Sequence, residues 1–170
     1  MKRKILSLII LALCLCLCFA LASCGEDEKD NKKGSGKNEV TFDSVVETLE
    51  KNAVKDSRSE FDISDDKNEI AEILYDFFGS EVIENFNGEI TNSLVCDQSG
   101  WGVVVLECKD KDDAENLLNA IESYSRYDDF YIRKVENLVF AGSSEYIIDV
   151  AIGEEEFDAD KVSKSSIGYQ

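Results

Sequence analysis

Histidine is absent from this 170-residue sequence, and its absence removes several classes of catalytic site. Without an imidazole, the chain cannot build the general base of a Ser-His-Asp or Cys-His enzyme. It also lacks the side chain that binds catalytic zinc most often. The sequence has no CxxC pair and no phosphate-binding GxxxxGK[ST] or GxGxxG segment. We therefore expect a noncatalytic protein without a cofactor, and carboxylate chemistry is what remains open to an enzyme.

Basic residues are scarce: 18 Lys and Arg stand against 36 Asp and Glu, which gives a net charge of −18. Binding to a phosphate backbone depends on clustered Lys and Arg. The composition therefore predicts no nucleic-acid partner. An acidic surface of this kind favours solubility, and the alternative is that it captures cations or a basic partner.

Four of the six cysteines lie close together near the N-terminus, at positions 14, 16, 18 and 24. The segment around them begins with the basic residues Lys2, Arg3 and Lys4 and continues with an apolar run from Ile5 to Leu21. This order is typical of a secretory signal peptide. The run is short for a membrane span, which needs about 20 apolar residues. A retained transmembrane anchor is the alternative.

The tripeptide Leu21-Ala22-Ser23 directly before Cys24 resembles the lipobox of bacterial lipoproteins. The resemblance implies cleavage after Ser23 and a diacylglyceryl group on Cys24. Two acyl chains anchor a protein far more firmly than one. By this resemblance the mature chain lies on the outer, extracytoplasmic face of the cell membrane, held there by its lipid. Because the first 23 residues hold three basic and no acidic residues, the mature net charge becomes −21.

The apolar pattern divides the chain into four parts. We expect a signal peptide over residues 1–23, the lipidated cysteine with a flexible tether over 24–40, a single α+β domain over 41–153, and an acidic, polar tail over 154–170. The tether lacks apolar periodicity, so it cannot bury enough surface to order itself.

Two helices are predicted at the start of the domain. Apolar residues recur with helical spacing from Phe42 to Leu49, and again from Ile70 to Phe78, with Asp66 as N-cap and Gly79 as the end of the second helix. The polar segment between them, residues 54–66, is typical of a loop.

A β-hairpin follows, with strands over residues 89–96 and 101–108. A three-residue loop ending at Gly100 would pair Cys96 with Gly102 and Ile90 with Cys108. In that register six residues share the core face, namely Ile90, Leu94, Cys96, Val104, Leu106 and Cys108. The two cysteines would then lie about 20 Å apart, beyond the roughly 7 Å that a disulfide spans. We expect both to be buried, unbonded thiols.

A second unit repeats the order of two strands and a helix. A helix is predicted over residues 109–124, strands over 130–134 and 138–141, and a last helix that ends at Gly153. We therefore predict an α+β fold: a two-layer sandwich in which a four-stranded, mainly antiparallel sheet carries helices on one face, preceded by two N-terminal helices.

Two stretches resemble a pattern found in small lipoproteins of clostridia and related Gram-positive bacteria. In the first, a strand and a charged turn lead to a helix of the form DAxxLxxAI, here Asp113 to Ile121. In the second, a strand-to-helix turn of the form NxVxxGxxE spans Asn137 to Glu145. The resemblance implies this fold and a cell-envelope setting, and it brings no catalytic residues.

Aromatic residues are the candidate binding groups. Trp101 stands between two glycines at the expected hairpin tip, and Tyr127 and Tyr131 lie in a connecting region with Tyr124 and Phe130. Exposed aromatic side chains anchor protein partners. The alternative is that they close the ends of a thin core, with the tyrosine hydroxyls in water.

The acidic segment Asp62 to Glu69 is the candidate metal loop, and we assign no metal to it. Lys67 and Ile73 stand where an EF-hand needs its glycine and its bidentate glutamate. Asp65 and Asp66 are better explained as helix-capping residues.

The function that these patterns favour is a lipid-anchored binding or interaction module with an envelope protein as partner. The alternatives are a small envelope hydrolase that uses a carboxylate pair, and an acidic cation-binding or structural lipoprotein. A pocket with two carboxylates of raised pKa would favour the enzyme, whereas an apolar surface patch would favour partner binding.

Overall fold

The computed structural model describes residues 39–54, 58–125 and 130–165 of the chain. The expected signal peptide, Cys24 and nearly all of the expected tether lie outside the described residues. The described helices and strands are, in chain order, α2 (Phe42–Asn52), β1 (Glu60–Ser64), α3 (Lys67–Phe78), α4 (Ser80–Asn85), β2 (Ile90–Gln98), β3 (Trp101–Cys108), α5 (Lys111–Tyr124), β4 (Tyr131–Val135), β5 (Leu138–Gly142), α6 (Glu145–Ala151) and α7 (Ala159–Ser165).

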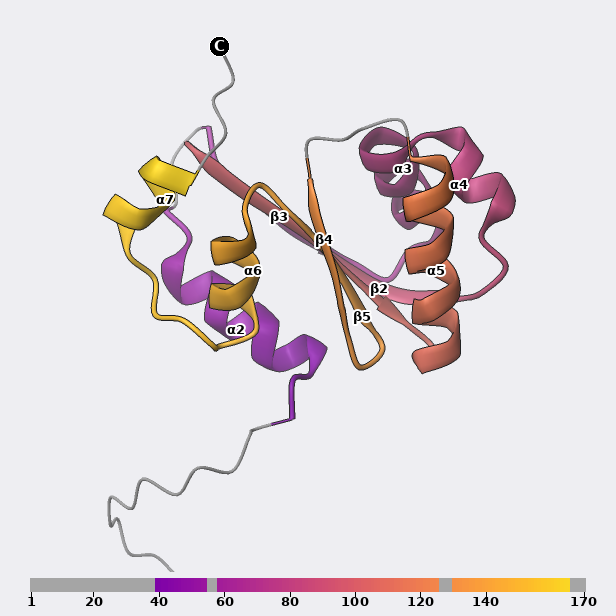
Figure 1. The fold of residues 1–170 in the computed structure, drawn as a ribbon, viewed down its shortest axis with the longest axis horizontal. Helices are drawn as coiled ribbons and strands as arrows, with labels where there is room; N and C mark the ends of the chain where they lie inside the picture. Colours follow the sequence, from indigo (N-terminus) through magenta and orange to yellow (C-terminus); the bar gives the residue numbers. More distant parts are fainter. Residues whose placement is uncertain (1–38, 55–57, 126–129, 166–170) are drawn as a thin grey trace, which may run out of the picture. The chain divides into compact units, whose positions relative to one another are not determined.

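The strands form one antiparallel sheet of five strands in the order β1-β2-β3-β5-β4. Helices α3, α4 and α5 cover one face, and α2, α6 and α7 cover the other (Figure 1). The α+β class and the antiparallel sheet are confirmed. The expected four strands and helices on a single face are wrong, because the sheet has a fifth strand and lies between two helical layers.

The sequence of β3 explains why both faces of the sheet are covered. Val103 and Val105 pack into the core beneath α2 and α6, while Val104 and Leu106 pack into the core beneath α3 and α5. All four are at most 2% exposed. A continuous apolar run of this kind is typical of a strand that is buried on both faces.

Strand β1 lies in the segment that we expected to be a loop. It pairs antiparallel with β2, from Glu60 opposite Asp97 to Ser64 opposite Ser93. Phe61 and Ile63 alternate with polar residues, as in a half-buried strand, but this pattern is only five residues long. Ser64 is the only buried residue of β1, and Ile63 is 46% exposed. The two predicted N-terminal helices, α2 and α3, are therefore separated by strand β1. The short helix α4 follows α3 directly after Gly79.

The hairpin register differs from the predicted one by a single residue. Gln98 pairs with Trp101 and Cys96 with Val103, so the loop is the two-residue turn Ser99-Gly100, with Gly100 at φ 107°. A one-residue shift moves every side chain of a strand to the opposite face. Leu94 and Cys96 therefore pack beneath α2 and α6, away from the core that Val104, Leu106 and Cys108 share.

An irregularity between Ile90 and Asn92 keeps one predicted pair intact. The register shifts there, and Ile90 stands opposite Cys108 as expected. The extra residue of a β-bulge reverses the alternation of the strand. Ile90 therefore joins Cys108 in the core beneath α3 and α5.

Short polar side chains begin the helices. Asp66 caps α3 as predicted, accepting hydrogen bonds from the backbone N–H groups of Asn68 and Glu69. Thr41 forms a capping box with Ser44 at the start of α2. Such caps satisfy N–H groups that have no partner within the helix.

The segment after Gly153, which we expected to be a polar tail, contributes to the core. The ring of Phe157 lies 5.6 Å from that of Trp101, and Val162 on α7 is 5% exposed. Both cores lie entirely within one compact unit, residues 38–170. This unit therefore holds the buried apolar surface that it needs to fold without the preceding residues.

Candidate functional site

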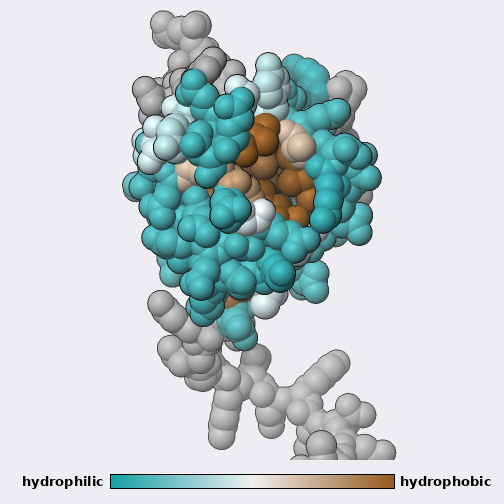
Figure 2. Space-filling view, turned by 90° about the vertical axis from the view of Figure 1, so that its right-hand side faces the viewer, coloured by the Kyte–Doolittle hydropathy of each residue, from teal (hydrophilic) through white to brown (hydrophobic). Residues whose placement is uncertain are grey.

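A hollow lined by partly exposed hydrophobic side chains lies on the side of the molecule formed by α3, α4 and α5 (Figure 2). Figure 2 views the molecule from this side, and apolar side chains gather there in a hollow with hydrophilic residues around it. The hydrophobic residues that pack against the core of this layer and stay partly exposed are Ile73, Phe77, Ile83, Phe86, Phe130 and Ile132. We call these six residues the apolar patch.

The spacing along α3 explains why two of its apolar residues reach the surface. Ile70, Leu74 and Phe78 face the sheet and are at most 5% exposed. Ile73 and Phe77 lie to one side of that stripe and are only partly buried. The helical stripe is thus wider than the surface that the sheet covers, and its outer part belongs to the apolar patch.

Phe77 and Phe130 connect distant parts of the chain within the patch. Phe77 lies in the last turn of α3, and Phe130 directly precedes β4. Their ring centroids are 5.7 Å apart and the rings are tilted by 53°. This distance and tilt are favourable for two aromatic rings. Because α4 packs against both α3 and α5, the three helices form one continuous surface around these side chains.

Charged residues on the same three helices are mostly acidic. They carry two lysines, Lys67 and Lys111, and nine carboxylates: Glu69, Glu72, Asp76, Glu81, Glu84, Asp112, Asp113, Glu115 and Glu122. Lys67 Nζ lies 3.2 Å from a carboxylate oxygen of Glu89, and Lys111 pairs with Glu136. Both lysines are therefore paired with carboxylates outside the three helices. Glu115 is paired with Lys134 of β4 at 2.8 Å, and acidic charge still predominates on the three helices.

The predicted aromatic anchors occupy different positions. Trp101 is 8% exposed and packs in the core beneath α2 and α6, which is the core-closing position that we gave as the alternative. Tyr131 on β4 is 36% exposed. Its neighbour Ile132 packs against the core beneath α3 and α5 and belongs to the apolar patch. Because successive side chains of a strand point to opposite faces, Tyr131 lies on the face opposite the patch. Tyr127 lies outside the described residues. Of this aromatic group, Phe130 is the member that the structure brings to the patch.

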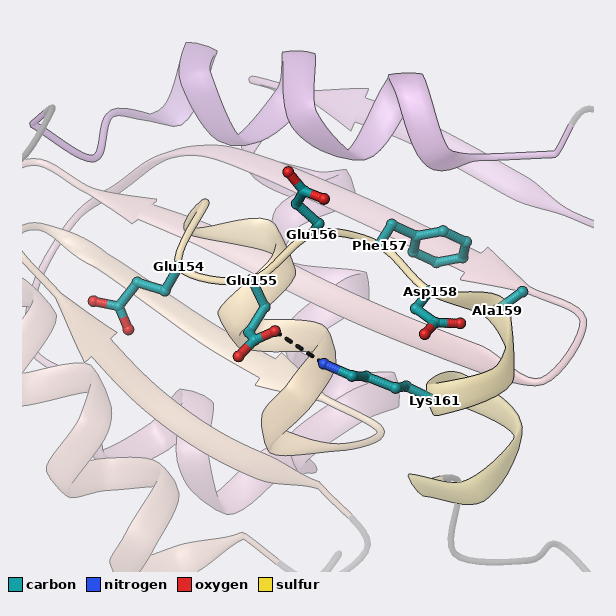
Figure 3. Close-up of a pocket in the computed structure, with 7 residues that line it drawn as sticks. All are labelled: Glu154, Glu155, Glu156, Phe157, Asp158, Ala159 and Lys161. Carbon is teal, nitrogen blue, oxygen red and sulfur yellow. Dashed lines mark hydrogen bonds and ion pairs between the residues drawn. The ribbon is translucent and has the colours of Figure 1, made fainter. Parts of the chain in front are cut away.

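The acidic loop after α6 forms a second candidate site. Its depression is lined by Glu154, Glu155, Glu156, Phe157, Asp158, Ala159 and Lys161, and the carboxylates of Glu154, Glu155 and Glu156 point in different directions (Figure 3). Lys161 Nζ lies 3.1 Å from Glu155 Oε2. Among the described residues no group of three or more acidic, Cys or His side chains is placed to hold a metal ion.

Tyr146 explains the shape of this loop. Its hydroxyl donates a hydrogen bond to the carbonyl oxygen of Glu156 at 2.6 Å and accepts one from the backbone N–H of Asp158 at 2.7 Å. Lys161 Nζ lies 5.2 Å from the centre of the Tyr146 ring. These contacts hold the loop against α6, so the polar groups that make them have a structural role.

A third depression, beside the start of α2, contains two acidic residues, Asp43 and Glu107. Its lining residues are Thr41, Phe42, Asp43, Val46, Ile63, Asn92 and Glu107. The amide of Asn92 donates to Glu107 Oε2 at 2.6 Å, and the hydroxyl of Thr91 lies 3.4 Å from the same atom. Glu107 thus accepts hydrogen bonds from side chains of the neighbouring strand β2. The arrangement suits a structural acceptor between β2 and β3.

Shifted carboxyl pKa values point to structural contacts as well. A hydrogen bond from Lys51 lowers the pKa of Glu47, and the backbone N–H groups of α3 lower that of Asp66. Hydrogen bonds from Lys67 and Lys111 lower the pKa values of Glu89 and Glu136. These four groups are held in the ionised form, whereas a catalytic acid needs a raised pKa.

The thiols of Cys96 and Cys108 are free and buried, as predicted, and they lie in different cores. Burial raises the pKa of each thiol to about 12. The thiolate is the reactive form of cysteine. Neither residue is therefore placed to act as a nucleophile or redox centre.

We expect both thiols to resist alkylation in the folded chain. With a pKa of about 12 instead of the usual 8.5 or so, labelling of residues 25–170 by iodoacetamide at pH 8 should be at least about 1000-fold slower than in 6 M guanidinium chloride. Mass spectrometry would follow the two additions. Rapid labelling of either cysteine under native conditions would contradict the burial described above.

Across the described ranges, no helix has the length and apolar character that a membrane span requires. The residues on which the lipobox resemblance depends lie before these ranges, so the anchor remains a prediction. The sequence matches no protein-family model, and the chain has no significant match to the curated proteins or to the solved structures.

Proposed function

We propose that this protein is a noncatalytic interaction module, anchored by lipid at Cys24 to the outer face of the cytoplasmic membrane, that binds an envelope protein through the apolar patch. The observation that carries the proposal is the hollow on the α3, α4 and α5 side, in which partly exposed hydrophobic side chains gather (Figure 2). Apolar surface of this kind is often a binding site. Burial of each Å² would contribute about 25 cal/mol.

Two features support a tethered module. Residues 38–170 contain both cores, so the domain does not need the membrane to complete its fold. The expected tether between Cys24 and the domain would let the patch face a neighbouring protein while the acyl chains stay in the bilayer.

The observations favour binding over the two alternatives. A hydrolase with a carboxylate pair would need a general acid of raised pKa, and the four carboxyl groups with resolved shifts in the described part have lowered values. Cation capture would need convergent carboxylates, whereas those of the acidic loop point apart (Figure 3) and Glu155 is paired with Lys161.

Site-specific photo-cross-linking in cells tests the proposal. The photoreactive residue p-benzoylphenylalanine would replace Phe77 in the patch or, as a control, Tyr75 on the same helix, which is 59% exposed. We expect irradiation to yield a discrete cross-linked species from position 77 and much less from position 75. The absence of a cross-link at position 77, or equal cross-linking at both positions, would contradict binding through the patch.

A further inference from the structure

We propose that the occupant of the apolar patch is an amphipathic helix of the partner, with apolar residues on one face and Lys or Arg on its flanks. This inference rests on the proposed function and deepens it, because it states the chemistry of the partner segment. Two observations carry it: four of the six patch residues lie on α3 or on α4 and its C-cap, and the charges on α3, α4 and α5 are mostly acidic.

The helical surroundings favour a helix as the occupant. The backbone groups of α3, α4 and α5 form hydrogen bonds within those helices, so their sides do not offer the free N–H and C=O groups of a sheet edge. Along α3 and α4 an extended peptide would leave its own backbone unpaired. Backbone pairing would be open to it only along β4, the five-residue outer strand that carries Ile132. A helix brings its backbone already paired and presents apolar side chains at i, i+3, i+4 and i+7, as in other helix-in-groove complexes.

The dimensions of the layer set the length of the occupant. Helix α3 has 12 residues and α5 has 14. At 1.5 Å per residue they are about 18 and 21 Å long. An apolar stripe of about three to four turns on the partner would therefore match the surface.

The charge of the layer favours a basic helix of the partner over an acidic one. Carboxylates outnumber lysines on α3, α4 and α5, and this excess attracts a basic segment. Glu115 is paired with Lys134, and the two lysines of these helices are paired with Glu89 and Glu136. Complementary charge raises the association rate and selects among apolar partners. A second copy of this chain has the same negative layer, and the whole chain carries a net charge of −18, so pairing of two copies through this layer is opposed.

The test uses residues 25–170 and a labelled 18-residue peptide of leucine and lysine, with leucine placed at i, i+3, i+4 and i+7. A scrambled peptide of the same composition is the control for charge alone, and a leucine and glutamate peptide is the control for sign. We expect fluorescence anisotropy to show binding of the amphipathic lysine peptide at least about ten-fold tighter than of either control, with weaker binding as salt is added.

Variants locate the site. Phe77→Ala should weaken binding about ten-fold, while Tyr75→Ala on the exposed side of the same helix should change it less than two-fold, or about 0.4 kcal/mol. The double change Glu72→Gln and Asp76→Asn should weaken binding and reduce its salt dependence. The matched double change Glu47→Gln and Glu50→Gln, on α2 in the opposite layer, should leave it unchanged. Circular dichroism would check the fold of each variant, and the charge variants decide the outcome if Phe77→Ala unfolds.

Several results would overturn the inference: equal affinity for the scrambled peptide, equal loss from the α2 charge variant, or a stable dimer in sedimentation that occupies the patch. If position 77 cross-links in cells but the lysine peptide does not bind, the interaction module stands and the partner chemistry proposed here is wrong. If the peptide binds as expected but position 77 gives no cross-link in cells, the proposed function fails separately.

Discussion

Replacing Phe140 by alanine is expected to lower the free energy of unfolding by about 3–5 kcal/mol, the usual cost of removing a buried phenylalanine side chain. Phe140 is 0% exposed in the inner strand β5 and packs in the core beneath α2 and α6. A domain of this size has about 5–15 kcal/mol of total stability, so the variant would lose a large part of it. Urea denaturation of residues 25–170 measures the change.

A matched change on the other face tests the three-layer arrangement. Phe78, 1% exposed beneath α3, should give a loss of similar size when it is replaced by alanine. Tyr75→Ala, on the exposed side of α3, should stay within about 0.5 kcal/mol of the wild type. If either phenylalanine behaved like Tyr75, that face of the sheet would not be covered as described.

Replacing Cys24 by alanine is expected to abolish membrane anchoring through lipid. In the wild type, mass spectrometry should find a mature N-terminus at Cys24 that carries a diacylglyceryl group. The variant should keep residues 1–23 and carry no acyl mass, because the thioether needs the cysteine sulfur. Detergent partitioning should change in parallel, since each buried CH₂ of an acyl chain contributes about 0.8 kcal/mol.

Cys18→Ala is the control for this experiment, because Cys18 lies in the apolar part of the expected signal peptide, where cysteine acts as a small apolar residue. Its processing and lipidation should match those of the wild type. Recovery of wild-type protein with residues 1–23 attached and without acyl groups would show that the prediction of a lipoprotein is wrong. A transmembrane anchor formed by Ile5 to Leu21 would then replace it.

The candidate site illustrates what a helical pattern can and cannot predict. The spacing of Ile70, Ile73, Leu74, Phe77 and Phe78 identified one apolar side of α3 correctly. The pattern could not distinguish the three residues that the sheet covers from Ile73 and Phe77, which stay partly exposed. That distinction depends on where α5 and Phe130 lie. Both are distant in sequence, so no local signal contains it.

The sequence by itself determined the local elements, because their signals involve residues a few positions apart. The helices around Leu49, Leu74 and Leu117, the cap at Asp66 and the two hairpins all follow from 3.6-residue or two-residue periodicity and from turn residues. The burial of both remaining cysteines without a disulfide was also predictable.

Only the tertiary structure decided how these elements combine. The segment Glu60–Ser64 alternates polar and apolar residues over only five positions, and its pairing with the backbone of β2 is what makes it a strand. Gln98 pairs directly with Trp101, which moves Cys96 to the opposite face from Cys108. The ring of Phe157 joins Trp101 in the second core. Each of these contacts depends on which side chains become buried on the two faces of the sheet. Burial is a property of the whole fold, so a local sequence pattern does not determine it.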